Sequence, residues 1–142
     1  MLKNELNAWC SNNISLDVFM RDAPIMAYST NGEGVFINVS TMWANKLQHS
    51  PTELIGRQSG DFLTPKSHTY TFEKIIPILQ DSGRLENVDF EFMAQDGTVI
   101  PVTISVQCIL ESGKMRTVVF AFDRTPITNL RDVISSLKSI PG

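Results

Sequence analysis

The sequence predicts an α+β fold in which short helices cover one face of a five-stranded antiparallel sheet. Residues 87–92 and 100–107 alternate between polar and apolar side chains, which is the two-residue period of a strand with one buried face. Asn31-Gly32 and Asp96-Gly97 supply the positive φ angles that tight hairpins need. Helix-start signals, in which a serine or threonine precedes a proline, lie between and after these strand candidates.

The strands are expected in two groups. Residues 25–30 and 35–38 form a leading hairpin, and residues 85–123 form a meander of three strands. The last strand of the meander, residues 115–123, carries an unbroken apolar run over residues 118–122. A run without alternation predicts a strand that is buried on both faces, and such a strand lies either centrally in the sheet or under another element.

Helices are expected between the two groups of strands and again after them. Asn38 or Ser40 caps the first helix, and residues 50–53 form a complete capping box with proline at the first helical position. A longer helix begins at Thr64-Pro65 and has apolar residues at i, i+3, i+4 and i+7. Pro77 is expected to kink this helix, because proline removes a backbone donor and clashes with the preceding turn.

Composition argues against several classes of function. The chain has 142 residues, the size of one domain, with 42% hydrophobic residues and a net charge of −3. No basic stripe favours nucleic-acid binding, and no apolar run reaches the ~20 residues of a membrane span. Cys10 and Cys108 have no metal-ligand spacing, so we expect no metal site. No signal-peptide pattern is present, and a reducing cytoplasm is expected.

Motifs for catalysis are missing from the sequence. It contains no G-x-S-x-G, no G-x-x-x-x-G-K and no H-E-x-x-H. Its aspartates precede turns and helices, where they are better explained as turn and cap residues than as acid–base pairs. We therefore expect that the chain is not an enzyme.

The order of elements, together with particular residues, resembles a PAS domain, the sensory module of many signalling proteins. The similarity covers residues 19–125 and is specific in combination. The segments that carry it are Asp22-Ala23-Pro24 with Ile25, Tyr28-Ser29-Thr30-Asn31-Gly32, Asn38, Leu47 with residues 50–57, Asp61-Phe62-Leu63 with Pro65, Asp96-Gly97-Thr98 with Pro101-Val102, and Asp123-Arg124-Thr125. Arg124 replaces the aliphatic residue usual at its position, which matters little if its side chain faces water.

The resemblance implies a place for a ligand between the sheet and the long helix. The candidate wall consists of large apolar and aromatic side chains expected to face that space. They are Tyr28, Phe36, Met42, Trp43, Phe62, Phe72, Ile75, Leu79, Phe90, Ile104, Val106, Val118 and Phe120. The alternative is that they simply fill the core, because large side chains interdigitate to near-crystalline density.

The motifs with which PAS relatives bind two cofactors, flavin and haem, differ from the corresponding residues of this chain. Flavin-binding, light-sensing relatives carry a reactive cysteine in a G-x-N-C-R-F-L-Q run, and residues 56–63 of this chain have Ser59 or Gly60 at that place. Thiol-adduct flavin chemistry is therefore excluded. Haem-binding relatives place an axial histidine well inside the long helix, whereas His68 falls in its first turn. We do not expect haem, and the cofactor stays unassigned.

The chain is expected to have an N-terminal amphipathic flank over residues 1–18, a PAS-like sensor domain over 19–124 and an exit helix over 125–142. The exit helix carries apolar residues at heptad a and d positions, namely Ile127, Leu130, Ile134 and Leu137. Two heptads are too short for a coiled coil alone, so the helix either pairs with a second chain or folds back on the sheet. We expect a homodimer, and a fragment of a longer bacterial sensor.

Three functional hypotheses remain. In the first, a small ligand or a partner changes the packing of the sheet, and Asp123, Arg124 and Thr125 relay this change through the exit helix to an effector domain. The effector belongs to the same longer chain or to a partner signalling protein, such as a histidine kinase or a diguanylate cyclase. In the second, the chain is a ligand-free dimerisation and scaffold module. The third, an enzyme, rests only on the principle that a fold does not exclude a function.

Overall fold

One antiparallel sheet organises the molecule. The computed structural model describes residues 21–22 and 24–138, so the predicted flank over residues 1–18 lies outside the described residues. The strands are β1 (Met26–Asn31), β2 (Phe36–Val39), β3 (Arg84–Met93), β4 (Val99–Glu111) and β5 (Lys114–Asp123). They pair antiparallel in the order β2-β1-β5-β4-β3. The five-stranded sheet and the central place of its last strand are thus confirmed.

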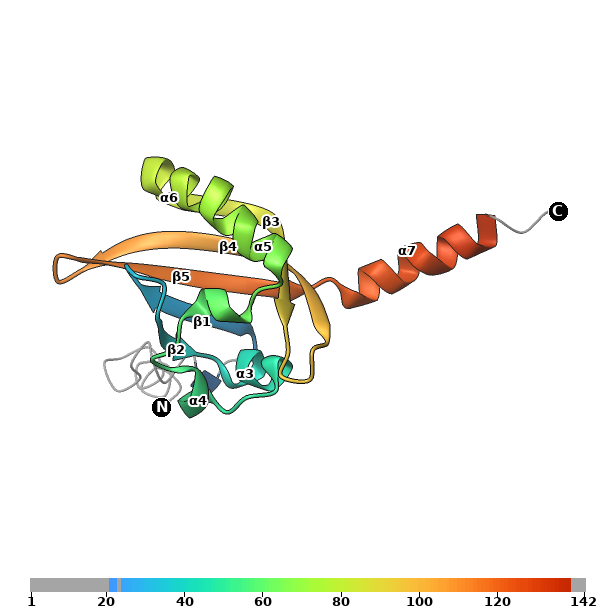
Figure 1. Ribbon diagram of the computed structural model, residues 1–142, viewed down its shortest axis with the longest axis horizontal. Coiled ribbons are helices and arrows are strands. Elements are labelled where there is room, and N and C mark those ends of the chain that lie inside the picture. Colours follow the sequence, from blue (N-terminus) through green and yellow to red (C-terminus); the bar gives the residue numbers. More distant parts are fainter. Residues whose placement is uncertain (1–20, 23, 139–142) are drawn as a thin grey trace, which may run out of the picture.

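Short helical segments connect β2 to β3 and cover one face of the sheet (Figure 1). They are α3 (Thr41–Leu47), α4 (Pro51–Leu54), the 3-10 helix η1 (Ser59–Phe62), α5 (Pro65–Tyr70), the π-helical segment η2 (Thr71–Ile75) and α6 (Ile76–Ser82). The last three run end to end, and we call them together the roof helix. A further helix, α7 (Thr125–Lys138), follows β5. The α+β prediction is therefore confirmed.

Polar caps fix where the short helices begin, as the sequence predicts. Of the two candidate caps for α3, Ser40 is the one used, and its Oγ accepts hydrogen bonds from the backbone N–H groups of Trp43 at 3.1 Å and Ala27 at 3.0 Å. Ser50 and Glu53 form the reciprocal capping box of α4. Because Ser40 also binds the backbone of β1, it fixes α3 against the sheet.

The roof helix contains a π-helical turn next to Pro77. Within η2 the backbone N–H of Ile76 donates to the carbonyl of Thr71, one residue beyond the usual α-helical partner. Pro77 has no N–H to donate to Glu73, and its ring clashes with that carbonyl. Widening the preceding turn is a known way to accommodate such a break. The kink expected at Pro77 therefore takes the form of a π-helical segment.

Large aromatic side chains pack between α3 and the sheet. Trp43 is fully buried, stacks on Tyr28 with 5.4 Å between ring centroids, and meets Phe92 edge-on at 4.6 Å. Phe36 meets Tyr28 edge-on at 5.1 Å. Stacked and edge-to-face pairs are the favourable arrangements of aromatic rings. We call Tyr28, Phe36, Trp43 and Phe92 the aromatic core.

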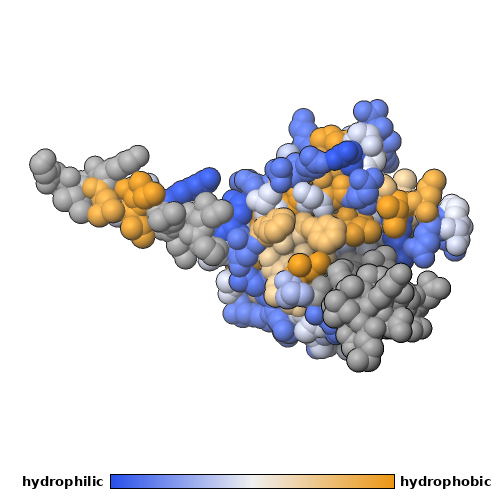
Figure 2. All heavy atoms as spheres, turned by 180° about the vertical axis from the view of Figure 1, so that it is seen from behind, coloured by the Kyte–Doolittle hydropathy of each residue, from blue (hydrophilic) through white to orange (hydrophobic). Residues whose placement is uncertain are grey.

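The two faces of β5 have different surroundings, which corrects the prediction that this strand is buried on both. Val119 and Ala121 are buried under the helices, whereas Phe120 and Phe122 are 45% and 66% exposed on the opposite face. Figure 2 shows apolar side chains gathered at the centre of that opposite face. Both faces of β5 carry apolar residues, and this conceals the two-residue period of the strand in the sequence.

Helix α7 projects away from the sheet, so it does not fold back on it (Figure 1). Among its described side chains, Val133, Ile134 and Leu137 are exposed. Ile127 and Leu130 also belong to α7, but their side chains are not among those that the structure describes. Within the described part of the chain, no helix has the length and apolar character needed to cross a bilayer.

Candidate functional site

A cavity lies between the inner face of the sheet and the roof helix. Its volume is about 300 Å³, which is at the lower end of the range typical of small-molecule pockets. Its floor comes from β1, β3, β4 and β5, its cover from the roof helix, and its rim from residues 31–34 and 58–60. It lies between the sheet and the long helix, where the sequence analysis expects a ligand, and it is partly open to solvent at its rim.

Strand geometry brings the floor residues together. Tyr28 and Thr30 lie two residues apart on β1 and therefore point to the same face. In the sheet they stand opposite Val119 and Thr117 of β5. Ile104 and Val106 extend the same face across β4. From the other side, the roof helix contributes Phe72, Ile75 and Leu79 to the lining.

The predicted wall divides into three groups. The residues that line the cavity are Tyr28, Phe72, Ile75, Leu79, Phe90, Ile104 and Val106. Phe36, Trp43 and Phe62 are instead buried in the core, as the alternative of core filling expects. Met42 is an exposed residue of α3. Val118 and Phe120 point to the opposite face of the sheet, because they alternate along β5 with the lining residues Thr117 and Val119.

Several lining residues were missed because they are small or polar. Thr30 and Thr117 meet across β1 and β5, with 2.5 Å between their hydroxyl oxygens. The period of β1 points to Thr30, which follows Tyr28 by two residues, but only the strand pairing identifies Thr117. Cys108 also lines the cavity and is half-buried.

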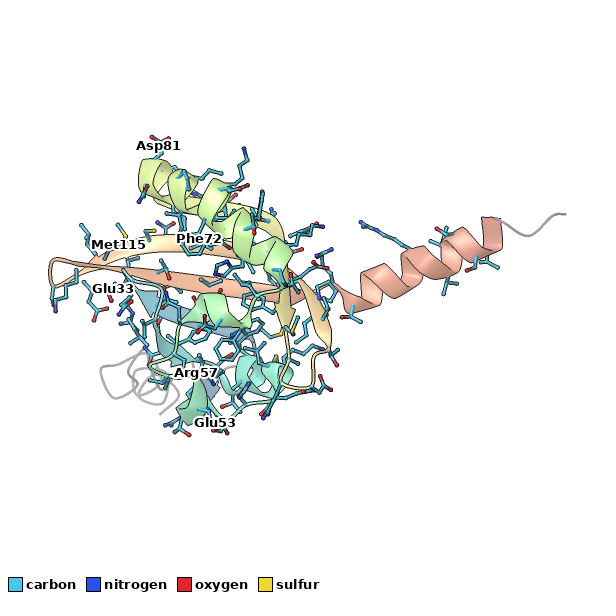
Figure 3. The ribbon with its side chains drawn as sticks, viewed as in Figure 1. Glu33, Glu53, Arg57, Phe72, Asp81 and Met115 are labelled. Carbon is cyan, nitrogen blue, oxygen red and sulfur yellow. The ribbon has the colours of Figure 1, made fainter. Side chains whose placement is uncertain are left out.

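The cavity is nearly free of formal charge. Among the described residues that line it, only Glu33 carries an ionised side chain, and this residue lies exposed at the rim. In Figure 3, Phe72 lies between the roof helix and the sheet, while Glu33 and Met115 lie toward the hairpin end (left). Burial raises the pKa of the Tyr28 hydroxyl well above its ordinary value, and it also raises the pKa of the Cys108 thiol. Both groups are therefore neutral near pH 7.

His68, the histidine of the roof helix, does not line the cavity. Its ring lies against Phe72, with 4.9 Å between centroids. In the described part of the chain, no three histidine, cysteine, aspartate or glutamate side chains gather into a group that would hold a metal ion.

The β5–α7 junction is fixed by Asp123. Its Oδ2 lies 2.5 Å from Nζ of Lys46 in α3, and its Oδ1 accepts a 2.8 Å hydrogen bond from the backbone N–H of Thr125. Burial alone would raise the pKa of Asp123, but hydrogen bonds from Lys46 and Thr125 outweigh it and hold the pKa below its ordinary value. One carboxylate thus connects the end of the sheet with α3 and with the first turn of α7.

Arg124 turns back toward β3 instead of into water. Its Nε lies 3.4 Å from Oδ1 of Asp89, and only 22% of its side chain is exposed. Its backbone N–H donates to the carbonyl of Pro101 in β4 at 2.8 Å. The side chain of Arg124 therefore does not face water, which was the condition for the replacement of an aliphatic residue to matter little. Through Asp123 and Arg124 the junction contacts α3, β3 and β4.

A comparison with protein families decides which family this architecture represents. The model of the PAS fold matches residues 15–124, which is most of the chain. The chain belongs to the PAS family. Within the curated proteins, none matches this PAS domain.

Solved PAS domains share its fold at low sequence identity. One from an HTR-like protein of Haloarcula marismortui is 17% identical, with a TM-score of 0.64, 86% of this chain covered and 97% of that one. One from a two-component sensor histidine kinase is 12% identical, with a TM-score of 0.64 and coverages of 86% and 96%. One in complex with ethanol, from a LuxR-family transcriptional regulator of Burkholderia thailandensis, is 16% identical, with a TM-score of 0.64 and coverages of 78% and 97%. At these identities the likeness shows the fold alone.

Proposed function

We propose that this PAS domain is a sensory module that binds a small molecule in the cavity and relays the change through β5 and α7 to an effector domain. The course of β5 is the observation that carries the proposal. Thr117 and Val119 of this strand line the cavity, and the same strand ends at Asp123 in the junction. Roughly 20 Å of continuous extended chain connects the two places.

A relay requires two packings of similar free energy and a ligand that prefers one of them. The β5–α7 junction is attached to α3 through Lys46 and to β3 through Asp89. A shift of β5 relative to either element changes these attachments and, with them, the direction in which α7 leaves the sheet. The effector we propose is a histidine kinase, a diguanylate cyclase or a transcription regulator, in a cytoplasmic and bacterial protein. Two of the structural neighbours come from a sensor histidine kinase and a LuxR-family regulator, which supports outputs of this kind.

The alternative is a ligand-free dimerisation module, and exposed apolar surface favours it. Phe120 and Phe122 on the open sheet face and Ile134 and Leu137 on α7 are exposed in the single chain. A second copy would cover such surfaces in a symmetric dimer. Dimerisation is compatible with sensing as well, so occupation of the cavity distinguishes the two functions.

Filling the cavity is expected to abolish binding of a purely apolar probe. Toluene should shift amide NMR signals of lining residues in the wild-type chain. Replacing Leu79 by tryptophan adds an indole ring from the roof helix into the cavity, so these shifts should disappear. Ile78→Trp is the matched control, because Ile78 is the neighbouring residue of α6, is exposed and does not line the cavity. Equal toluene shifts in Leu79→Trp would contradict binding in this cavity.

Two variants of Asp123 are expected to separate the effect of its charge from the effect of its hydrogen bond to the Thr125 N–H. Asp123→Ala removes both the partner of Lys46 and the acceptor for the Thr125 N–H, so amide exchange at Thr125 should accelerate. Asp123→Asn keeps the Oδ1 acceptor and loses only the charge, so exchange at Thr125 should stay nearly as slow as in the wild type. Equal exchange in all three proteins would show that Asp123 does not hold the first turn of α7.

The Asp123–Lys46 pair should also respond to pH in a defined direction. The folded chain holds the pKa of Asp123 below the value of about 3.9 expected in the unfolded chain. The stabilisation from the pair is therefore complete above that value and is lost as the pH falls through the lower, folded pKa. Asp123→Asn should remove this part of the acid dependence of unfolding, whereas an unchanged acid dependence would assign it to other groups.

A further inference from the structure

The cavity contains a hydrogen-bond donor that no described residue satisfies. Thr30 and Thr117 each have one hydroxyl hydrogen, and their oxygens form a single hydrogen bond with each other. Whichever hydroxyl donates, the hydrogen of the other remains unused, and neither hydroxyl bonds to a further described group. Thr30 is buried, Thr117 is half-buried, and both residues line the cavity. A buried donor without an acceptor is costly, so a molecule in the cavity that offers an acceptor gains from this site.

The rest of the lining is unfavourable for an ionised molecule. The floor and the cover are mainly aliphatic and aromatic, as in Phe72, Ile75, Phe90 and Val106. Among the described lining residues there is no lysine, arginine or histidine to pair with an anion, and the carboxylate of Glu33 at the rim repels one. For a cation, the exposed carboxylate of Glu33 is the only charged partner among the described lining residues. Moving an unpaired charge from water into such a space is strongly unfavourable.

We propose that the cavity selects an uncharged, mainly apolar small molecule with a hydroxyl, carbonyl or ether oxygen that accepts a hydrogen bond from the Thr30–Thr117 hydroxyl pair. The volume of about 300 Å³ suits a small molecule. This inference rests on the proposed ligand-binding function and adds the chemical class of the ligand. It assigns specificity to two threonines that contact the ligand across the β1–β5 pairing.

Four probes that share one aromatic ring and one attached carbon separate the contributions of charge and hydrogen bonding. They are benzyl alcohol, benzoate, benzylammonium and toluene, titrated into the isotope-labelled chain at pH 7 with amide shifts of lining residues as the readout. Benzyl alcohol is expected to bind, whereas benzoate and benzylammonium should bind at least about tenfold more weakly. Benzoate or benzylammonium binding as tightly as benzyl alcohol would overturn the selectivity for uncharged molecules.

Valine substitutions test the threonine pair with nearly unchanged shape. In Thr30→Val or Thr117→Val alone, the remaining hydroxyl loses its partner but still has one free hydrogen, so each single variant should keep the preference for benzyl alcohol. The double variant has no donor left. Its affinity for benzyl alcohol relative to toluene should fall about fivefold, while toluene binds as before. An unchanged ratio in the double variant would overturn the role of the pair.

The outcomes also separate this inference from the function on which it rests. Toluene binding with benzoate preferred over benzyl alcohol would leave the ligand site in place and overturn its proposed chemistry. No binding of any of the four probes would overturn both the ligand-binding function and the selectivity. Well-dispersed amide spectra of the single and double valine variants provide the control for folding.

Discussion

Replacement of Trp43 by alanine is expected to lower the free energy of unfolding by about 3–5 kcal/mol. Trp43 is fully buried, stacks on Tyr28 and meets Phe92 edge-on, so its loss leaves a large void at the centre of the aromatic core. The interior is close-packed and relaxes only partly around such a void. Because small domains are stable by about 5–15 kcal/mol in total, this one change removes a large fraction of the stability. Urea unfolding of the wild type and the variant measures this difference in the free energy of unfolding.

Two further variants make the Trp43 prediction specific. Trp43→Phe keeps an aromatic ring in place and removes the indole N–H, which is buried without a hydrogen-bond partner among the described residues. It should therefore cost less than Trp43→Ala. Leu110→Ala serves as the control, because Leu110 is 78% exposed, and its effect should stay within about 0.5 kcal/mol. A cost below about 1.5 kcal/mol for Trp43→Ala would contradict the central role of the aromatic core.

Ser40→Ala is expected to cost about 2–4 kcal/mol although it removes a single oxygen atom. Ser40 is fully buried, and its Oγ accepts the N–H groups of Trp43 and Ala27. Alanine leaves both donors buried and unpaired, one at the start of α3 and one in β1. The unfolding midpoint in urea should fall with an unchanged m-value, because the surface exposed on unfolding stays the same.

Ser50 provides the matched control for Ser40. It caps α4 with the same chemistry, but it is exposed, so water replaces its hydroxyl when Ser50→Ala is made. The cost should be about 0.5–1 kcal/mol. Equal costs for Ser40→Ala and Ser50→Ala would mean that the link between β1 and α3 adds nothing beyond an ordinary helix cap.

The fold was largely predictable because its signals are local. The alternation in β3 and β4, the capping box at Ser50 and the proline starts of α5 and α7 each depend on neighbouring residues only. The burial of β5, by contrast, depends on elements that are distant from it in the sequence. An apolar run cannot show which of its two faces another element covers, and Phe120 and Phe122 turned out to be exposed on the open face.

The cavity was predictable in position but not in composition. The sequence indicates which side chains face the helices, and Ile104 and Val106 are among them. It does not indicate where packing leaves space, because a cavity is a small difference between the volume of the side chains and the volume between the elements. Phe36 and Trp43 therefore fill the core, while Thr30 and Thr117 reach the cavity through a strand pairing that links distant parts of the chain.

The π-helical segment determines which side chains of the roof helix face the cavity. On the floor, residues two apart along a strand share a face. In η2 one extra residue is inserted in the turn, because the N–H of Ile76 donates to the carbonyl of Thr71. An inserted residue rotates the helix beyond it by about 100° relative to an uninterrupted α-helix. Phe72 and Ile75 lie within η2 and Leu79 lies beyond it, and all three line the cavity, so the part that α6 contributes to the cover depends on this one insertion.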